Sequence, residues 1–321
     1  MKLVLPTLIA ALCCWVGLLW LRRPGRLPSD HPNRRSLHVR AMPRGGGAAI
    51  WLGWLAACAI ALPIQAWLAP LLLLILVSFW DDWKSLPPAL RLLVHVAAGA
   101  LWIVLAAPSL NAAIALFAIV WMTNLFNFMD GSDGMAATMA LFGFGAYAVA
   151  GAASGSAADP ALVALVAAVV PFFFFNFPPA RLMLGDVGAV PLGFLAAVFG
   201  IEGWQSGEWP AWFPILVFYP FIADATVTLA RRLMRRKRIW EAHSEHYYQK
   251  LVQMGFGHAG TLALYAALMA GTSLSGLAAG LRAPGAGPSL LLFWSVILAC
   301  MYGTIDYLWH RSGGQFRESK G

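Results

Sequence analysis

Charged residues are scarce in this chain of 321 residues, since Asp, Glu, Lys and Arg together make up 11% of it. Soluble domains carry about a quarter of their residues as charges, so this low fraction excludes an ordinary soluble enzyme. Polar stretches are also few, and the longest are residues 21–45 and 231–258. We therefore predict one membrane-embedded domain over residues 1–321, without a large soluble domain.

Cysteine is rare as well, with Cys13, Cys14, Cys58 and Cys300 all inside apolar stretches. Their spacing fits no metal site, and we interpret them as free thiols that pack as small apolar side chains. The net charge of +8 would suit nucleic acid in a soluble protein. Here the positive charges follow membrane topology, so we expect no nucleic-acid partner.

What the sequence has in abundance is apolar runs long enough to cross a lipid bilayer. Prolines mark several of the short breaks between them, as expected for tight turns between antiparallel helices. The predicted fold is an all-α, polytopic integral membrane helical bundle of about eleven spans. The expected spans are residues 3–21, 46–63, 65–80, 89–107, 110–127, 135–153, 160–177, 187–203, 211–230, 260–281 and 288–309. The first run lacks a convincing cleavage site, so we interpret it as a membrane helix rather than a signal peptide.

Lys and Arg are divided unevenly between the two sides of these spans. Of the 22, only Lys2 and Arg282 fall on the side of the N-terminus. The positive-inside rule then predicts an N-terminus outside and a C-terminus in the cytoplasm. The cytoplasmic loops are expected at about residues 22–45, 81–88, 128–134, 178–186 and 231–259. Mid-span charges are scarce and no internal repeat is visible, which disfavours the alternative of a non-enzymatic membrane transporter.

Carboxylates occur where the apolar runs meet the cytoplasmic loops. Asp81 and Asp82 directly follow one run, and their mutual repulsion requires a nearby cation. Lys84 and Arg91 could supply it as salt bridges, and a divalent metal would do so better. Because a carboxylate next to lipid is costly, we predict a functional role for this pair.

The loop near residue 130 reads Asn124-Leu-Phe-Asn127-Phe-Met-Asp130-Gly-Ser-Asp133-Gly. A spacing of three places Asn124, Asn127 and Asp130 along one helix face. Amide and carboxylate oxygens suit Mg²⁺ and sugar hydroxyls rather than zinc. An ordinary helix-ending turn would explain the glycines, but it would not explain this concentration of Asn and Asp at a membrane boundary.

The first cytoplasmic loop combines basic residues with glycines, namely Arg34, Arg35, Arg44, Gly45 and Gly46. Backbone N–H groups of a glycine run at a helix start favour phosphate. The three arginines would add charge-assisted hydrogen bonds. The alternative is a basic loop that binds lipid headgroups.

Two later loops add further candidates. Asn176 precedes Asp186, which stands at the start of an apolar helix, where an N-cap is the structural alternative. The last long loop contains His243-Ser-Glu-His246-Tyr-Tyr-Gln249. Its two histidines lack an obvious third metal ligand, so we expect hydrogen bonding or phosphate contact. Four other polar residues receive no role in the site: His95, Asp224, His258 and Asp306.

In their order along the chain, these segments resemble the polyprenyl-phosphate N-acetylhexosamine-1-phosphate transferases, the MraY/WecA-like glycosyltransferase family 4. The likeness covers nearly the whole chain and includes the Asp81-Asp82 pair. Its most specific element is the Asn-x-x-Asn-x-x-Asp-Gly-x-Asp-Gly signature that begins at Asn124. The stretch from His243 to Gln249 lacks the clustered histidines of other branches and is most similar to the WbpL-like O-antigen branch.

The resemblance implies transfer of N-acetylhexosamine-1-phosphate, from a deoxy-HexNAc or GlcNAc donor, to undecaprenyl phosphate. The donor would be a UDP-N-acetylhexosamine, UMP would leave, and the product would begin O-antigen or surface polysaccharide synthesis. The alternative within the family is a MurNAc-pentapeptide translocase of peptidoglycan synthesis. The likeness also implies a multi-pass protein of the bacterial inner (plasma) membrane with its active site on the cytoplasmic face. The likeness leaves open whether the protein forms a homodimer.

Site roles follow from the same likeness. It implies Mg²⁺, with Mn²⁺ as a substitute, bound by Asp186 and Asp82. The implied catalytic residues are Asp81, Asp82, Asp130 and Asp133. The residues implied to contact substrate or phosphate are Arg34, Arg35, Arg44, Gly45, Gly46, Asn124, Asn127, Asn176, His243, His246 and Gln249.

Overall fold

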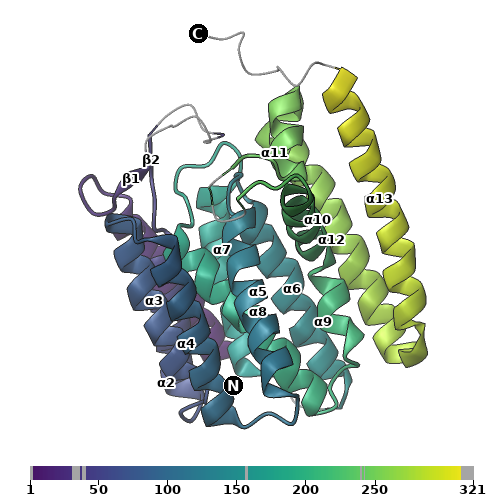
Figure 1. Cartoon of the computed structure of the whole chain (residues 1–321). Coiled ribbons are helices and arrows are strands. Elements are labelled where there is room, and N and C mark those ends of the chain that lie inside the picture. The colour runs from purple at the N-terminus through teal and green to yellow at the C-terminus, as the bar shows by residue number, and fades with distance from the viewer. Residues whose placement is uncertain are drawn as a thin grey trace.

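The computed structural model is a bundle of α-helices that run roughly side by side (Figure 1). It describes residues 3–30, 37, 41–155, 158–238, 241 and 243–311, so the predicted contacts Arg34 and Arg35 lie outside the described residues. The helices are α1 (Val4–Leu21), α2 (Gly47–Ala61), α3 (Leu68–Trp83), α4 (Pro88–Ala106), α5 (Ala112–Met129), α6 (Met135–Ala153), α7 (Pro160–Asn176), α8 (Asp186–Gln205), α9 (Trp212–Val217), α10 (Tyr219–Met234), α11 (Tyr247–Leu251), α12 (Gly257–Arg282) and α13 (Gly287–Arg311). A π-helical turn (Val252–Phe256) precedes α12, a 3₁₀ turn (Pro284–Ala286) precedes α13, and β1 (Ser29–Asp30) pairs antiparallel with β2 (Met42–Pro43).

Each predicted span coincides with a helix, with one exception. The span expected over residues 211–230 is divided into α9 and α10, with Phe218 between them and Pro220 in the first turn of α10. By length and composition, seven helices of the described chain can cross a membrane, and α2 and α7 are shorter apolar helices. The all-α polytopic membrane fold is therefore confirmed, while the count of about eleven spans stays a prediction.

Helix α8 lies at the centre of the bundle, where it contacts α2, α3, α5, α6 and α9. Glycines on its surface let the neighbouring helices approach closely. A Cβ on Gly47 of α2 would collide with the backbone of Gly188, and a Cβ on Gly193 would collide with the carbonyl of Met122 on α5. This packing places the first residue of α8, Asp186, beside the start of α2.

The polar loops gather at one end of the bundle. Figure 1 shows the β1–β2 hairpin, α11 and the last turns of α13 at this end. The predicted cytoplasmic loops thus share one end, as alternating spans require. Which side of the membrane this end faces stays a prediction from the charge distribution.

Candidate active site

Asp82 fixes the beginning of α8. This buried residue near the end of α3 accepts the backbone N–H of Asp186 on Oδ1, at 2.9 Å, and that of Val187 on Oδ2, at 3.1 Å. These are N–H groups that a helix start leaves without a partner inside the helix. The N-cap position belongs to Gly185, at a φ of 77°, so the N-cap role considered for Asp186 is wrong. The Asp186 side chain instead bonds to Arg44.

Two arginines connect the carboxylates. Arg44 Nε lies 2.8 Å from Asp82 Oδ1, and its Nη2 donates to Asp186 Oδ1. Arg91 Nη1 lies 3.5 Å from Asp81 Oδ2 and 3.4 Å from Asp186 Oδ2. A planar guanidinium with several donors can bind two carboxylates at once. The cation that the Asp81-Asp82 pair was predicted to need is thus supplied by these two side chains.

Asp130 joins this group from the end of α5. It lies near the backbone N–H of Gly185 and within electrostatic range of Asp82, Asp186 and Arg44. Burial raises the pKa of Asp130 well above its usual range, and the neighbouring carboxylates add to the rise. A further cation would favour its ionised form. We call the six side chains the carboxylate–arginine cluster: Asp81, Asp82, Asp130, Asp186, Arg44 and Arg91.

The donor set of the cluster fits Mg²⁺ or Mn²⁺, because carboxylate oxygens are hard ligands. In the described part of the chain, however, no three His, Cys, Asp or Glu side chains are grouped closely enough to hold a metal ion. The guanidinium of Arg44 lies between the two predicted metal ligands, Asp82 and Asp186. Metal binding there requires Arg44 to move or to share their oxygens.

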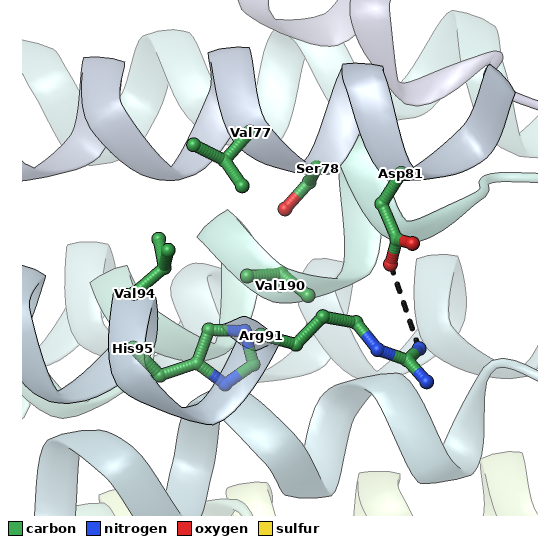
Figure 2. A pocket seen from close by; sticks show the side chains of 7 residues that line it. All are labelled: Val77, Ser78, Asp81, Arg91, Val94, His95 and Val190. Atoms are coloured by element: carbon green, nitrogen blue, oxygen red, sulfur yellow. Dashed lines mark ion pairs between the residues drawn. The ribbon is translucent and has the colours of Figure 1, made fainter. Parts of the chain in front are cut away.

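A small recess adjoins the cluster between α3, α4 and α8 (Figure 2). Its volume is about 10 Å³, and its lining includes Asp81, Arg91, Ser78 and His95 together with three valines. This is about the space of one water molecule. The buried ring of His95 lies close to the side chain of Asn124, a predicted substrate contact. His95, which received no role from the sequence, thus lies between Asn124 and the cluster.

Asp133 enters a separate set of contacts. Its Oδ2 accepts the backbone N–H of Ala180 at 2.9 Å, and its own N–H donates to His258 Nδ1 at 3.2 Å. Ser132 Oγ lies 2.9 Å from the same His258 nitrogen. His258 therefore holds the loop after α5, although nothing in its sequence surroundings indicated this. The catalytic role of Asp133 stays a prediction.

The predicted amides differ in their surroundings. Asn176 Oδ1 accepts the backbone N–H of Gly134 and its amide donates to the carbonyl of Leu182, both at 2.9 Å. These bonds tie the loop after α5 to the loop before α8. Asn124 donates to the carbonyl of Val120 at 2.7 Å, and Asn127 is partly buried one turn before Asp130. Their contacts with substrate stay predictions.

The glycines after Arg44 differ from the phosphate-binding loop that we predicted. Gly45 and Gly46 donate their N–H groups to the carbonyl of Met183, at 3.3 and 2.9 Å. A Cβ on Gly46 would lie 2.7 Å from the Leu182 side chain, and Gly45 has a φ of 108°. The N–H groups are thus used within the protein. The glycines hold Arg44 in place by allowing this close approach.

The histidine-containing loop, residues 243–249, folds against the end of α5. His246 stacks on Phe128 with ring centroids 6.1 Å apart, and the Tyr248 hydroxyl donates to the Phe128 carbonyl at 2.9 Å. Gln249 Oε1 accepts the backbone N–H of His246 at 3.1 Å. His243 stacks on His246, and burial lowers the pKa of His243 to about 4. The third and fifth predicted loops therefore meet.

This molecule is a polytopic membrane protein with an oxygen-rich and arginine-rich site at one end of its bundle. The family model of Glycosyl transferase family 4 matches residues 64–203 of the chain. The matched range contains Asp81, Asp82, Asp130 and Asp186, and it leaves out Arg44 and the loop at residues 243–249.

The chain is also similar to curated transferases. Over 253 residues, 71% of either protein, the chain is 25% identical to the probable undecaprenyl-phosphate N-acetylglucosaminyl 1-phosphate transferase of Bacillus subtilis (strain 168). It is 31% identical over 138 residues to the phospho-N-acetylmuramoyl-pentapeptide-transferase of Lacticaseibacillus paracasei, which covers 41% of this chain and 42% of that protein. It is 40% identical over 95 residues to the enzyme of that name from Lactiplantibacillus plantarum, at 28% and 30% coverage.

Proposed function

We propose that this protein transfers N-acetylhexosamine-1-phosphate from a UDP-sugar to undecaprenyl phosphate and releases UMP. The observation that carries the proposal is the carboxylate–arginine cluster at one end of a membrane bundle. Phosphoryl transfer requires positioning and charge neutralisation of phosphates more than covalent chemistry from the protein. The cluster offers guanidinium donors for phosphate oxygens and carboxylates for a divalent metal.

The residues of the cluster would have different roles in this reaction. Arg44 and Arg91 would bind phosphate oxygens of the donor or the lipid. Asp82 and Asp186 would hold Mg²⁺, or Mn²⁺ in its place, with Asp130 close by. Bound there, the metal would neutralise charge on the pyrophosphate as a Lewis acid. The acceptor phosphate is itself a nucleophile near neutral pH, so we favour its direct attack over an aspartyl-phosphate intermediate.

The direct mechanism can be tested by trapping. A sugar-phosphoryl adduct on Asp130 or Asp133, found by mass spectrometry after rapid quench with donor alone, would contradict direct attack. Absence of an adduct together with donor turnover that requires lipid phosphate is the expected result.

For the donor we propose a simple UDP-N-acetylhexosamine, either a deoxy sugar or GlcNAc. Two observations support this choice. The loop at residues 243–249 has the spaced form His243-Ser-Glu-His246 instead of clustered histidines. The relative named for N-acetylglucosaminyl transfer matches 71% of this chain, more than either pentapeptide transferase. The reaction would begin O-antigen or other surface polysaccharide synthesis at the cytoplasmic face of the bacterial inner membrane.

The second candidate is transfer of phospho-MurNAc-pentapeptide. Its support is the identity of 31% and 40% to two such enzymes, confined to 138 and 95 residues. These shared segments do not cover the whole chain. We therefore place this reaction after the simple sugar.

One assay separates the candidates. Purified protein in nanodiscs with undecaprenyl phosphate receives a panel of UDP-sugars, and UMP and the lipid product are measured. We expect turnover of a UDP-HexNAc that stops with a chelator and resumes with Mg²⁺. Asp186→Asn is the inactive control. Glu202→Gln, on α8 but hydrogen-bonded to Trp102 at the other end of that helix, is the matched active control. Turnover of UDP-MurNAc-pentapeptide alone would reject our choice of sugar.

A further inference from the structure

Asp224 is a completely buried carboxylate on α10, outside the carboxylate–arginine cluster. Its Oδ1 accepts the backbone N–H of Tyr247 at 2.9 Å, and its Oδ2 accepts that of Tyr248 at 3.0 Å. The hydroxyl of Tyr265, from α12, donates to Oδ2. His246 Nδ1 lies 3.3 Å from Oδ1. One carboxylate thus connects α10, α12 and the loop at residues 243–249.

Such a charge is expensive to bury, and an apolar or neutral residue of similar size could fill the space at lower cost. The cost is offset here by several donors, most of which come from residues 246–248. No Lys or Arg side chain of the described residues forms a salt bridge with Asp224. The negative charge of Asp224 is therefore stabilised mainly by the loop at residues 243–249.

The loop that Asp224 holds lies against the loop after α5. A Cβ on Gly131 would collide with the hydroxyl of Tyr248, so these two segments are in close contact. The ring of His246 stacks on Phe128, three residues before Gly131. A shift of residues 246–248 would therefore move His246 relative to the end of α5, where the carboxylate–arginine cluster begins.

The contact with Asp224 also orients the imidazole ring of His246. A carboxylate oxygen only accepts hydrogen bonds, so Nδ1 of His246 must carry the hydrogen in its contact with Asp224. The ring is thus held by Asp224 at Nδ1 and by its stacking on Phe128. His246 is among the residues predicted to contact substrate, so its placement bears on donor binding.

We infer that Asp224 is a positioning residue for the sugar donor, and that it acts by fixing the placement of His246. This inference rests on the proposed function, because it assumes a UDP-sugar as the donor. It assigns to Asp224 an effect on the donor and none on the lipid acceptor.

The test is Asp224→Asn, which keeps the size of the side chain but turns one acceptor into a donor that faces backbone N–H groups. We expect the KM for the UDP-sugar to rise about tenfold, as for loss of a charged hydrogen bond. The KM for undecaprenyl phosphate and kcat should change less than about threefold. Glu202→Gln serves as the control for removal of a membrane carboxylate and should leave both KM values unchanged.

A double-mutant comparison distinguishes positioning from general stability. If Asp224 acts through His246, then Asp224→Asn in a His246→Ala background should add less than about twofold to the KM of the donor. Full additivity, or a loss of rate in proportion to the folded fraction, would overturn the inference. If Asp224→Asn does not fold, Tyr265→Phe removes only one donor to the carboxylate. It should raise the KM for the UDP-sugar by about two- to threefold and leave the KM for undecaprenyl phosphate unchanged. An equal rise in both KM values would contradict the inference.

Hydrogen exchange separates this inference from the proposed function. The amides of Tyr247 and Tyr248 should exchange at least about tenfold faster in Asp224→Asn, without any substrate present. Unchanged exchange would overturn the inference even if the enzyme transfers sugar phosphate. Failure of the wild-type protein to release UMP from any UDP-sugar would instead reject the proposed function, while the exchange result would still report on the loop.

Discussion

Two groups of buried carboxylates in this protein differ in the partners that neutralise them. In the carboxylate–arginine cluster the side chain of Asp82 is 1% exposed, whereas those of Arg44 and Arg91 are 29% and 35% exposed. Around Asp224 the partners are two buried backbone N–H groups, the hydroxyls of Tyr265 and Thr228, and Nδ1 of His246. A half-exposed guanidinium can exchange one anion for another, but a buried backbone donor cannot move. We therefore expect the arginine partners of the cluster to exchange for ligand anions, although Asp82 also accepts two backbone N–H groups.

The strongest test of this difference is removal of charge from the cluster. Asp82→Asn and Asp186→Asn should each lower kcat/KM by at least about two orders of magnitude, on the order of 3 kcal/mol, because metal or phosphate positioning is lost. Initial rates of UMP release would measure it. Near wild-type turnover in either variant would remove that residue from the site.

Arg44→Lys tests whether the guanidinium geometry matters beyond its charge. Lysine keeps the charge but cannot reach Asp82 and Asp186 with one planar group, so we expect a loss of about tenfold in kcat/KM. Arg91→Lys is the comparison. Its contacts are longer, at 3.4 and 3.5 Å, so its effect should be smaller. Equal losses of kcat/KM in the two variants would mean that the shorter contacts of Arg44 do not make it more important for activity than Arg91.

Gly47→Ala tests how the cluster is assembled. The added Cβ would collide with the backbone of Gly188, so α2 and α8 would have to move apart. We expect a destabilisation of about 1–3 kcal/mol, seen as a lower Tm. Gly145→Ala on α6, where nothing lies within 4 Å of the added Cβ, is the control. That change should be neutral or stabilising by about 0.5–1 kcal/mol, and a similar drop in both variants would refute the packing argument.

The smallest expected effect concerns acid stability. Burial lowers the pKa of His243 from its ordinary value of 6.5 to about 4, so the unfolded chain binds this proton first as the pH falls. The contribution of neutral His243 to stability is complete above pH 6.5 and declines as the pH drops toward 4. His243→Asn should therefore flatten the fall of Tm across this range. An unchanged slope would show that other groups dominate it.

The helices and the chemical character of the site could be predicted from the sequence because both depend on local pattern. Apolar runs located the helices, and Asp81, Asp82 and Asp186 stood at their ends. The pairing of Arg44 with Asp82 and Asp186 could not be foreseen, since it depends on the approach of α2 to α8. Asp224 lay inside a predicted span, and its partners come mostly from residues far along the chain, including two backbone N–H groups, which carry no sequence signature. Its role could emerge only from three-dimensional contacts.

The central position of α8 has a consequence for the lipid environment. Its apolar stretch is 89% buried within the protein, against 22% for α4 and 17% for α13. A thicker or thinner bilayer acts on helices that face lipid, which tilt or shift to match it. Asp186 begins a helix that is shielded from lipid and is tied to Asp82 by backbone bonds. The alignment of Asp186 with Asp82 is therefore insulated from bilayer thickness, and lipid headgroup charge should affect turnover more than acyl chain length.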